Sequence, residues 1–155
     1  MGKGAKKLPP DKDSKDDRKK HWDLCHDIVQ VFYTVYNELG FRFLEAVYEE
    51  ALAIAMKEAG FTVSRQVATP IWFRGRKIGD YKADLVVNNA VLIELKAARA
   101  LDSSHEAQTL NYLRATEFEV ALLLNFGPKP QFRRLVFENE RKGGRIASRA
   151  ASTQY

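Results

Sequence analysis

Three charged residues interrupt two apolar, strand-like runs in the middle of this 155-residue chain. Residues 80–96 read Asp-Tyr-Lys-Ala-Asp-Leu-Val-Val-Asn-Asn-Ala-Val-Leu-Ile-Glu-Leu-Lys, and the charges set within the runs are Asp84, Glu94 and Lys96. Val, Ile and Tyr favour strands, and the polar residues 88–90 predict a turn, so we expect a hairpin. A charge in a buried strand costs free energy unless a partner charge or a metal compensates it. The function of the chain should therefore explain this hairpin.

The length of the turn decides whether the two carboxylates share a face of the sheet. A two-residue loop, Asn88-Asn89, would place Asp84 and Glu94 on opposite faces. A three-residue loop that includes Ala90 would pair them directly. We predict the three-residue loop, with an asparagine in the left-handed region, which Asn tolerates better than most residues. The carboxylates would then lie about 5 Å apart at the backbone, and they would repel each other unless a cation or a proton lay between them.

A hard divalent cation with oxygen ligands fits this need, so the pair predicts a site for Mg²⁺ or Mn²⁺. The backbone carbonyl of Leu95 is a further candidate ligand. Lys96 lies on the same face as Glu94, because side chains alternate along a strand, and it could hold a phosphate oxygen or stabilise an attacking hydroxide. The alternative is a carboxylate–lysine pair on a solvated face. The run 91–93 is too apolar for a strand with one solvated face, which favours a site at the strand end.

The rest of the sequence predicts one domain, residues 21–137, between two polar basic tails. Amphipathic periodicity predicts helices over 22–39 and 43–60, each ended by a glycine. In the second helix the expected buried stripe is Leu44, Val47, Tyr48, Ala51, Leu52, Ala55 and Met56. Residues 61–73 should be β structure with a start or break near Pro70, and residues 74–77 a turn. Two further strands are expected over 119–125 and 131–137, the second of them at an edge of the sheet.

A third helix is expected from Ser103 to Thr116. Asp102 or Ser103 is the candidate N-cap, with Glu106 completing a capping box, and the core stripe should include Ala107, Leu110 and Leu113. The predicted order is α-α-β-β-β-β-α-β-β, an α/β (α+β) fold. The strand–helix–strand unit 90–125 favours a parallel crossover.

The positive net charge lies mainly in the two tails. Residues 1–20 hold eight Lys/Arg and four Asp, and residues 138–155 hold four Lys/Arg and two Glu, so the body carries −1 of the net +5. The basic charge is therefore poor evidence that the body binds nucleic acid, and we predict that residues 1–20 are disordered. A local basic cluster in the body is interpreted first as solvated surface: Arg65, Arg74, Arg76, Lys77 and Lys82.

Cys25 is the single cysteine, which excludes an intrachain disulfide and suits a reducing cytoplasm. No run reaches the roughly 18 apolar residues of a membrane span, and we expect no membrane association.

One face of the third helix is unusually polar. His105, Gln108 and Tyr112 recur at helical spacing and share that face. The structural interpretation is that Tyr112 is a core aromatic with a bonded hydroxyl and that the other two lie at the surface. Glu45, at the start of the second helix, could likewise simply suit the helix dipole.

Taken in order, Glu45, Asp84, Glu94-Leu95-Lys96 and Gln108…Tyr112 resemble the RecB-like motif set of the PD-(D/E)XK nuclease superfamily. Residues 28–137 more closely resemble the small GxxExxY protein family. The carrying stretches are 38–50, 83–87, 92–97 and 105–113. The resemblance implies a restriction-endonuclease-like core with a mixed central sheet flanked by helices. It also implies Glu45, Asp84 and Glu94 around a metal, a catalytic Lys96, and Gln108 and Tyr112 as supporting residues, with His105 as a further candidate.

The sequence departs from the GxxExxY pattern at Arg42, which stands where the family has its glycine, although Gly40 remains. Arg42 makes the approach to Glu45 bulkier and more basic, and it could contact a phosphate. The leading hypothesis is a Mg²⁺-dependent nuclease acting on DNA, in which water deprotonated near the site attacks phosphorus. The alternatives are an inactive module that binds nucleic acid or a protein partner, and a hydrolase acting on RNA or nucleotides. The first helix is apolar enough to contribute to a homodimer interface.

Overall fold

The structure is a computed structural model that describes residues 20–142. The predicted disorder of residues 1–19 and the polar tail over 143–155 lie outside the described residues. The helices are α1 (Trp22–Leu39), α2 (Glu45–Glu58), α3 (Ser103–Ala115) and a short 3-10 helix, η2 (Asn139–Lys142). The strands are β1 (Val63–Phe73), β2 (Arg76–Val87), β3 (Val91–Lys96), β4 (Val120–Phe126) and β5 (Pro130–Val136). None of the helices in the described part is long and apolar enough to cross a bilayer.

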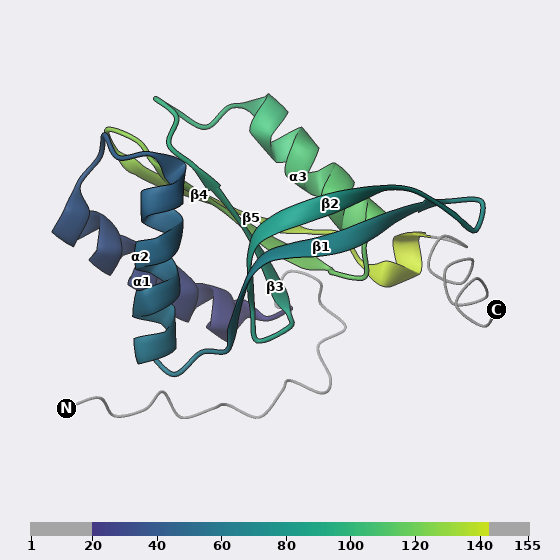
Figure 1. The fold of residues 1–155 in the computed structure, drawn as a ribbon, viewed down its shortest axis with the longest axis horizontal. Coiled ribbons are helices and arrows are strands. Elements are labelled where there is room, and N and C mark those ends of the chain that lie inside the picture. Colours follow the sequence, from purple (N-terminus) through teal and green to yellow (C-terminus); the bar gives the residue numbers. More distant parts are fainter. Residues whose placement is uncertain (1–19, 143–155) are drawn as a thin grey trace.

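The five strands form one mixed sheet in the order β1-β2-β3-β4-β5 (Figure 1). β3 and β4 run parallel, and the other neighbours are antiparallel. The connection between β3 and β4 contains α3, as a parallel crossover requires. The parallel crossover and the edge position of the last strand are confirmed. So is the predicted fold class, a mixed α/β core consistent with a restriction-endonuclease-like fold.

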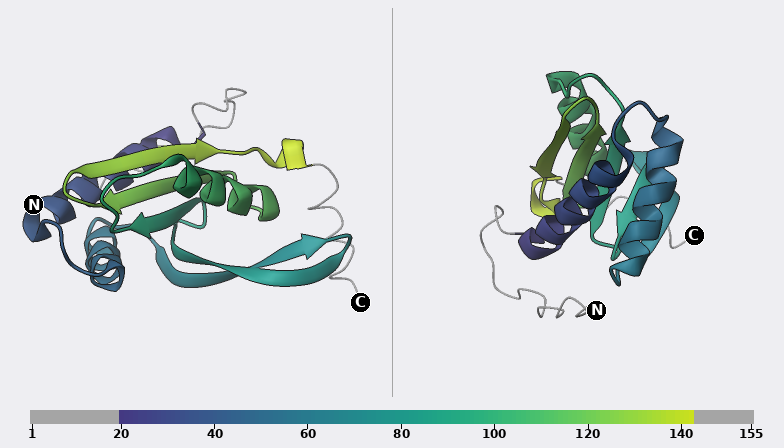
Figure 2. Two further views of the ribbon diagram at one scale, coloured as in Figure 1. Left: turned by 90° about the horizontal axis from the view of Figure 1, so that it is seen from above. Right: turned by 90° about the vertical axis from the view of Figure 1, so that its left-hand side faces the viewer.

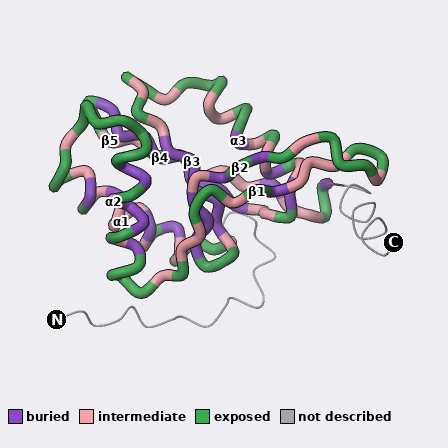
Figure 3. Tube along the Cα trace, viewed as in Figure 1, coloured by how far each residue is buried: buried purple, intermediate pink, exposed green. Residues whose placement is uncertain are grey.

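Two apolar cores lie on opposite faces of the sheet, with α1 and α2 on one face and α3 on the other (Figures 1 and 2). In β3, Val91, Ile93 and Leu95 pack beneath α1 and α2, whereas Leu92 packs towards α3. All seven residues of β4 are buried, so this strand is covered on both faces. Figure 3 shows buried segments in the central strands of the sheet and in the helices that cover them. The end of β3 is thus held rigidly between two packed layers.

The turn between β2 and β3 has the predicted length. Val87 pairs with Val91, so three residues form the turn. Asn88 (φ 51°) and Asn89 (φ 52°) both adopt the left-handed conformation. Asn88 is also tied to Thr62: its backbone N–H donates to the Thr62 carbonyl at 2.8 Å, and its side-chain Oδ1 accepts from the Thr62 N–H at 2.9 Å. The register on which the site prediction depends is therefore confirmed.

β1 and β2 form a long hairpin arm that extends beyond the rest of the sheet (Figures 1 and 2). The predicted break at Pro70 is wrong, because β1 continues through Pro70 opposite Asp80. Three strands therefore precede α3 where we expected four. A proline is tolerated here because β1 is an edge strand, so its missing N–H removes no bond to another strand. The turn at the tip is also shorter than expected, with Arg74 and Gly75 both at positive φ.

α2 begins two residues later than expected, at Glu45. Leu44 therefore lies outside the helix in an extended conformation. It is exposed, as is Val47, although both were expected in the buried stripe. The buried face instead follows the i, i+4 row of Tyr48, Leu52 and Met56 and includes Glu49 and Ala53.

α3 is capped by Asp102, one of the two predicted residues, but Glu106 does not complete the capping box. The third helical position counted from Asp102 is His105, and its Nδ1 accepts from the Asp102 backbone N–H at 3.2 Å. The predicted core residue Ala107 is exposed, whereas Leu113 is buried as expected and Thr109 is buried in addition.

The packed domain extends past residue 137, where we expected it to end. Lys142 is buried, and its Nζ donates to the carbonyls of Thr116 (2.8 Å) and Phe118 (2.6 Å) and to Asn139 Oδ1 (2.6 Å). Burial lowers the pKa of Lys142 to about 8. The segment up to η2 therefore belongs to the body of the protein.

Candidate active site

Asp84 and Glu94 lie where β2 separates from β3. The register places them opposite each other, one step beyond the last regular pair, Leu85–Ile93. Asp84 is half-buried, and its Oδ2 accepts the Leu95 backbone N–H at 2.8 Å. Glu94 is buried, with 7% of its surface exposed. The structure thus places two carboxylates together at the carboxyl end of a central strand, as the turn length predicted.

Burial and nearby charges raise the pKa values of both carboxylates. Burial, reinforced by the charge of Asp84, raises the pKa of Glu94 to about 7. The Tyr81 hydroxyl and Lys96 act in the opposite direction. Burial also raises the pKa of Asp84, against the Leu95 N–H, and the charges of Glu49 and Glu45 raise it further. A bound cation would relieve both effects.

The pleat of the hairpin arm reverses at Asp84. Regular alternation would put residues 81, 83, 85 and 87 on one face of the sheet. Leu85 and Val87 face α1 and α2, yet Tyr81 and Ala83 pack on the α3 side. Opposite Asp84 in β1, Gln66 adopts the left-handed conformation (φ 50°). Strict alternation would have turned Tyr81 away from Glu94, so this reversal brings the tyrosine to the site.

Tyr81 links Glu94 to α3. Its hydroxyl donates to Glu94 Oε1, and its ring stacks on Tyr112 with a centroid distance of 3.5 Å and an interplanar angle of 13°. Burial and the charge of Glu94 raise the pKa of Tyr81 far above its usual value, so the hydroxyl remains a donor. Tyr112 is therefore connected to Glu94 through Tyr81. Sequence reasoning missed Tyr81, because regular alternation along the strand would place its side chain on the face away from Glu94.

α2 brings two glutamates to the same region. Glu45 Oε1 accepts the Ala97 backbone N–H at 3.3 Å, which joins the start of α2 to the end of β3. Glu49, one turn later, is buried and is bound by Arg65 at 2.9 Å and by Gln66. Glu49 was missed, although its i, i+4 spacing from Glu45 was a usable signal. Arg65, expected in a basic surface cluster, is exposed and is paired with two acids of α2, Glu49 and Glu50.

The loop after Lys96 is clamped by the end of β4. Asn125, fully buried, accepts the Ala98 N–H at 2.9 Å and donates to the Ala98 carbonyl at 3.0 Å. Gln131 Oε1 accepts the Leu101 N–H at 2.9 Å. Asn125 is in register with Lys96, so it fixes the backbone immediately beyond the candidate catalytic lysine. Sequence reasoning read Asn125 as the end of an apolar strand and missed this role.

The sequence profile of the PD-(D/E)XK nuclease superfamily matches residues 22–135. The chain belongs to this superfamily. That Glu94-Leu95-Lys96 is its (D/E)XK element stays a prediction. Membership of the narrower GxxExxY family stays a prediction. No curated protein matches the chain at a significant level.

Two solved structures resemble the fold of this superfamily member. SSO0001 has 19% identity and a TM-score of 0.49, with 70% of this chain and 58% of that chain covered. The alkaline exonuclease LHK-Exo from Laribacter hongkongensis has 12% identity and a TM-score of 0.40, with 70% and 64% covered. The chain thus spans less than two thirds of the length of either structure.

The site offers a divalent cation two carboxylates and not a complete set of protein ligands. Across residues 20–142, no group of three or more His, Cys, Asp and Glu side chains is arranged to hold a metal ion. Mg²⁺, however, is commonly held by one or two carboxylates and completes its shell with water and substrate phosphates. Asp84 and Glu94 fit that mode, and a cation beside them would counteract the rise in pKa that burial causes in both.

The roles predicted for the site residues all stay predictions, and three of these residues remain to be placed. Gln108 is exposed on α3, one turn before Tyr112. His105 is engaged in the N-terminal cap of that helix. Arg42 lies on the α1–α2 loop with its guanidinium 5.1 Å from the centroid of the Phe41 ring.

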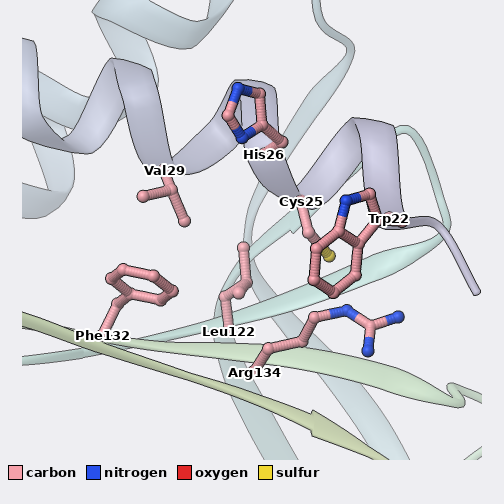
Figure 4. Close-up of a pocket in the computed structure, with 7 residues that line it drawn as sticks. All are labelled: Trp22, Cys25, His26, Val29, Leu122, Phe132 and Arg134. Carbon is pink, nitrogen blue, oxygen red and sulfur yellow. The ribbon is translucent and has the colours of Figure 1, made fainter. Parts of the chain in front are cut away.

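A hollow between α1 and β5 is separate from the site (Figure 4). It is lined by Trp22, Cys25, His26, Val29, Leu122, Phe132 and Arg134. None of the acidic residues discussed above is among them. Burial raises the pKa of the Cys25 thiol, against the effect of Arg134, so the cysteine is poorly suited to act as a nucleophile.

Gly127 provides a test of the clamp on the loop. A Cβ at this position would overlap the Ala98 carbonyl oxygen and lie 2.9 Å from Asn125 Nδ2. Gly127→Ala should therefore displace the loop beyond Lys96 and destabilise the protein by about 1–3 kcal/mol. Gly79→Ala is the matched control, because a Cβ there meets nothing within 4 Å. Urea denaturation of both variants measures the difference, and equal stabilities would contradict the proposed close packing.

Proposed function

We propose that this PD-(D/E)XK chain is a nuclease that requires Mg²⁺ or Mn²⁺ and hydrolyses phosphodiester bonds of DNA. The observation that carries the proposal is the pair Asp84–Glu94 at the end of β3, two residues before Lys96. Buried carboxylates with raised pKa values beside a lysine are costly as structure alone. They are suited to a site completed by a divalent cation and a phosphate.

Each residue of the pair is held in place by a neighbour. Asp84 is fixed by the Leu95 N–H and Glu94 by Tyr81, so Tyr81 and Tyr112 act as positioning residues. Asp84 and Glu94 would hold the cation, with the Leu95 carbonyl and Glu45 as further proposed ligands. When bound, the cation supplies Lewis acidity towards the phosphate and lowers the pKa of a coordinated water.

Lys96 is proposed to act on the phosphate. It is partly exposed at the end of a strand that is otherwise buried, so its ammonium can reach substrate while its backbone stays fixed. A preorganised cation at this position stabilises the negative charge that develops on the phosphoryl oxygens. Exposed cations on the neighbouring loops, Arg42, Arg99 and Lys129, suit a polyanionic substrate.

A cleavage panel tests the proposal. The full-length protein is incubated with single- and double-stranded DNA and RNA in Mg²⁺, in Mn²⁺ or in EDTA. We expect DNA to be cleaved with either metal and to stay intact in EDTA. Cleavage of RNA alone would support the RNA alternative. Absence of cleavage, together with no Mg²⁺ or Mn²⁺ binding at millimolar concentration by calorimetry, would support a non-catalytic binding module.

A further inference from the structure

Five apolar side chains are exposed beside Glu45, within residues 39–47. Their exposed fractions are 36% for Leu39, 40% for Phe41, 47% for Phe43, 78% for Leu44 and 42% for Val47. They occupy the last residue of α1, the α1–α2 loop and the start of α2. The fold leaves them uncovered, and a concentration of exposed apolar groups marks a binding surface more often than chance exposure does. Because Glu45 bonds to the residue after Lys96, this surface adjoins the candidate active site.

The loop that carries the two phenylalanines is anchored on Tyr48. The Tyr48 hydroxyl donates to the Gly40 carbonyl at 2.6 Å and accepts the Phe43 N–H at 3.3 Å. The Tyr48 ring is fully buried and stacks on Phe126 with a centroid distance of 4.1 Å. The Phe43 ring meets Tyr48 edge-on at 5.9 Å. The loop is therefore preorganised by the core.

Arg42 stands between the two phenylalanines in the sequence and has φ 91°, a conformation that suits glycine far better than arginine. Such strain costs free energy and is found preferentially at functional sites. The guanidinium lies over the Phe41 ring, so it presents a cation beside an aromatic face.

Other loops add cations at the same end of the sheet. Arg99 follows the strand that carries Lys96, and its carbonyl lies close to Gly127 in the β4–β5 turn, two residues before Lys129. Tyr36, near the end of α1, donates to the Gly127 carbonyl at 2.7 Å, which ties that turn to the helix that leads into the loop.

We propose that Phe41, Arg42 and Phe43 form a base-stacking platform that binds an unpaired nucleic-acid strand next to the active site. Aromatic faces stack on any base, and arginine provides both stacking and a charge for the phosphate. Bases paired within a duplex do not offer their faces to such a platform. The platform therefore directs the enzyme to single-stranded DNA or to unpaired ends. The inference rests on the proposed function for its substrate, but the binding that it predicts does not require catalysis.

The hairpin arm offers a matched control. Phe73 at its tip is 56% exposed, and Arg74 lies 5.0 Å from its ring centroid, so it reproduces the pairing of Phe41 with Arg42. The tip lies at the end of the molecule remote from the α1–α2 loop (Figure 1). If any exposed Phe–Arg pair bound nucleic acid, both the α1–α2 loop and the tip of the hairpin arm would contribute to binding.

The test measures binding by fluorescence anisotropy in EDTA, with the full-length protein and labelled oligothymidine or a duplex of the same length. We expect the double variant Phe41→Ala/Phe43→Ala to bind the single strand about 10- to 100-fold more weakly. Duplex binding and the affinities of Phe73→Ala should change little. Phe41→Trp/Phe43→Trp should restore single-strand binding. Arg42→Gly should weaken it and make its salt dependence shallower, by about 0.7 in the log–log slope, without lowering the melting temperature.

Several results would overturn the platform. They are an unchanged single-strand affinity of the double variant, an equal loss in Phe73→Ala, an equal loss for single strand and duplex, or no single-strand binding by the wild type. An equal loss for single strand and duplex would show that the phenylalanines do not stack on unpaired bases. Absence of single-strand binding by the wild type would point to a protein partner for the patch. If the platform variants behave as expected but no substrate is cleaved in the panel, the proposed nuclease activity fails and the binding site stands.

Discussion

Replacing Lys96 by alanine is expected to lower kcat by about 10²- to 10³-fold, the typical cost of removing one preorganised charge-stabilising group. The lysine follows Glu94 by two residues at the end of β3, where the strand ceases to be fully buried. It is placed to contact the phosphate and not to hold the fold together. Calorimetry should therefore find Mg²⁺ affinity in Lys96→Ala that is close to that of the wild type, because the two carboxylates remain.

Lys82→Ala is the matched control for that experiment. Lys82 is an exposed lysine on the same hairpin, two residues before Asp84, and no catalytic role is proposed for it. Its removal changes the net charge of the protein by the same amount as removal of Lys96. Full metal-dependent cleavage by Lys96→Ala, or an equal loss of rate in Lys82→Ala, would refute the assignment of Lys96. Both proteins must be purified identically, because a trace of contaminating nuclease would mask the difference.

The central hairpin could be predicted because local rules determine it. The turn contains two residues that tolerate positive φ, and the apolar runs on each side could pair in a limited number of registers. Asn88 and Asn89 took the left-handed conformation, and Asp84 came opposite Glu94 as a consequence. The ends of α1 and the parallel crossover likewise followed from periodicity and connection length.

The support of the site could not be predicted in the same way. Tyr81 reaches Glu94 because both strands of the arm reverse their pleat at Gln66 and Asp84, and no local pattern announces that reversal. Asn125 clamps a loop 27 residues away, a contact that exists only once β3 and β4 are aligned. Pro70 was misread because the sequence did not show that β1 lies at an edge, where a missing N–H costs little.

Glu94→Gln is expected to make the metal-free protein more stable above pH 7, although it removes a residue proposed for catalysis. The folded state raises the pKa of Glu94 from its ordinary 4.5 to about 7, so folding favours the protonated acid. This contribution is complete below about pH 4.5 and is lost as the pH rises through about 7. Each pKa unit corresponds to about 1.4 kcal/mol, so the wild type should lose about 3 kcal/mol across this window. Glutamine cannot ionise, and the variant should keep that stability.

Urea denaturation in EDTA at about pH 5 and about pH 8 measures the effect as the difference between the two proteins at each pH. The Asp84 pKa is also raised by burial, so a smaller loss with the same sign should persist in the variant. Glu58→Gln, at the exposed end of α2, controls for the change in net charge. Addition of Mg²⁺ at about pH 8 should stabilise the wild type, because a cation between Asp84 and Glu94 relieves their repulsion, and it should stabilise Glu94→Gln far less. Parallel pH profiles for the wild type and Glu94→Gln would show that Glu94 ionises without cost. The carboxylate pair would then no longer be evidence for a cation site.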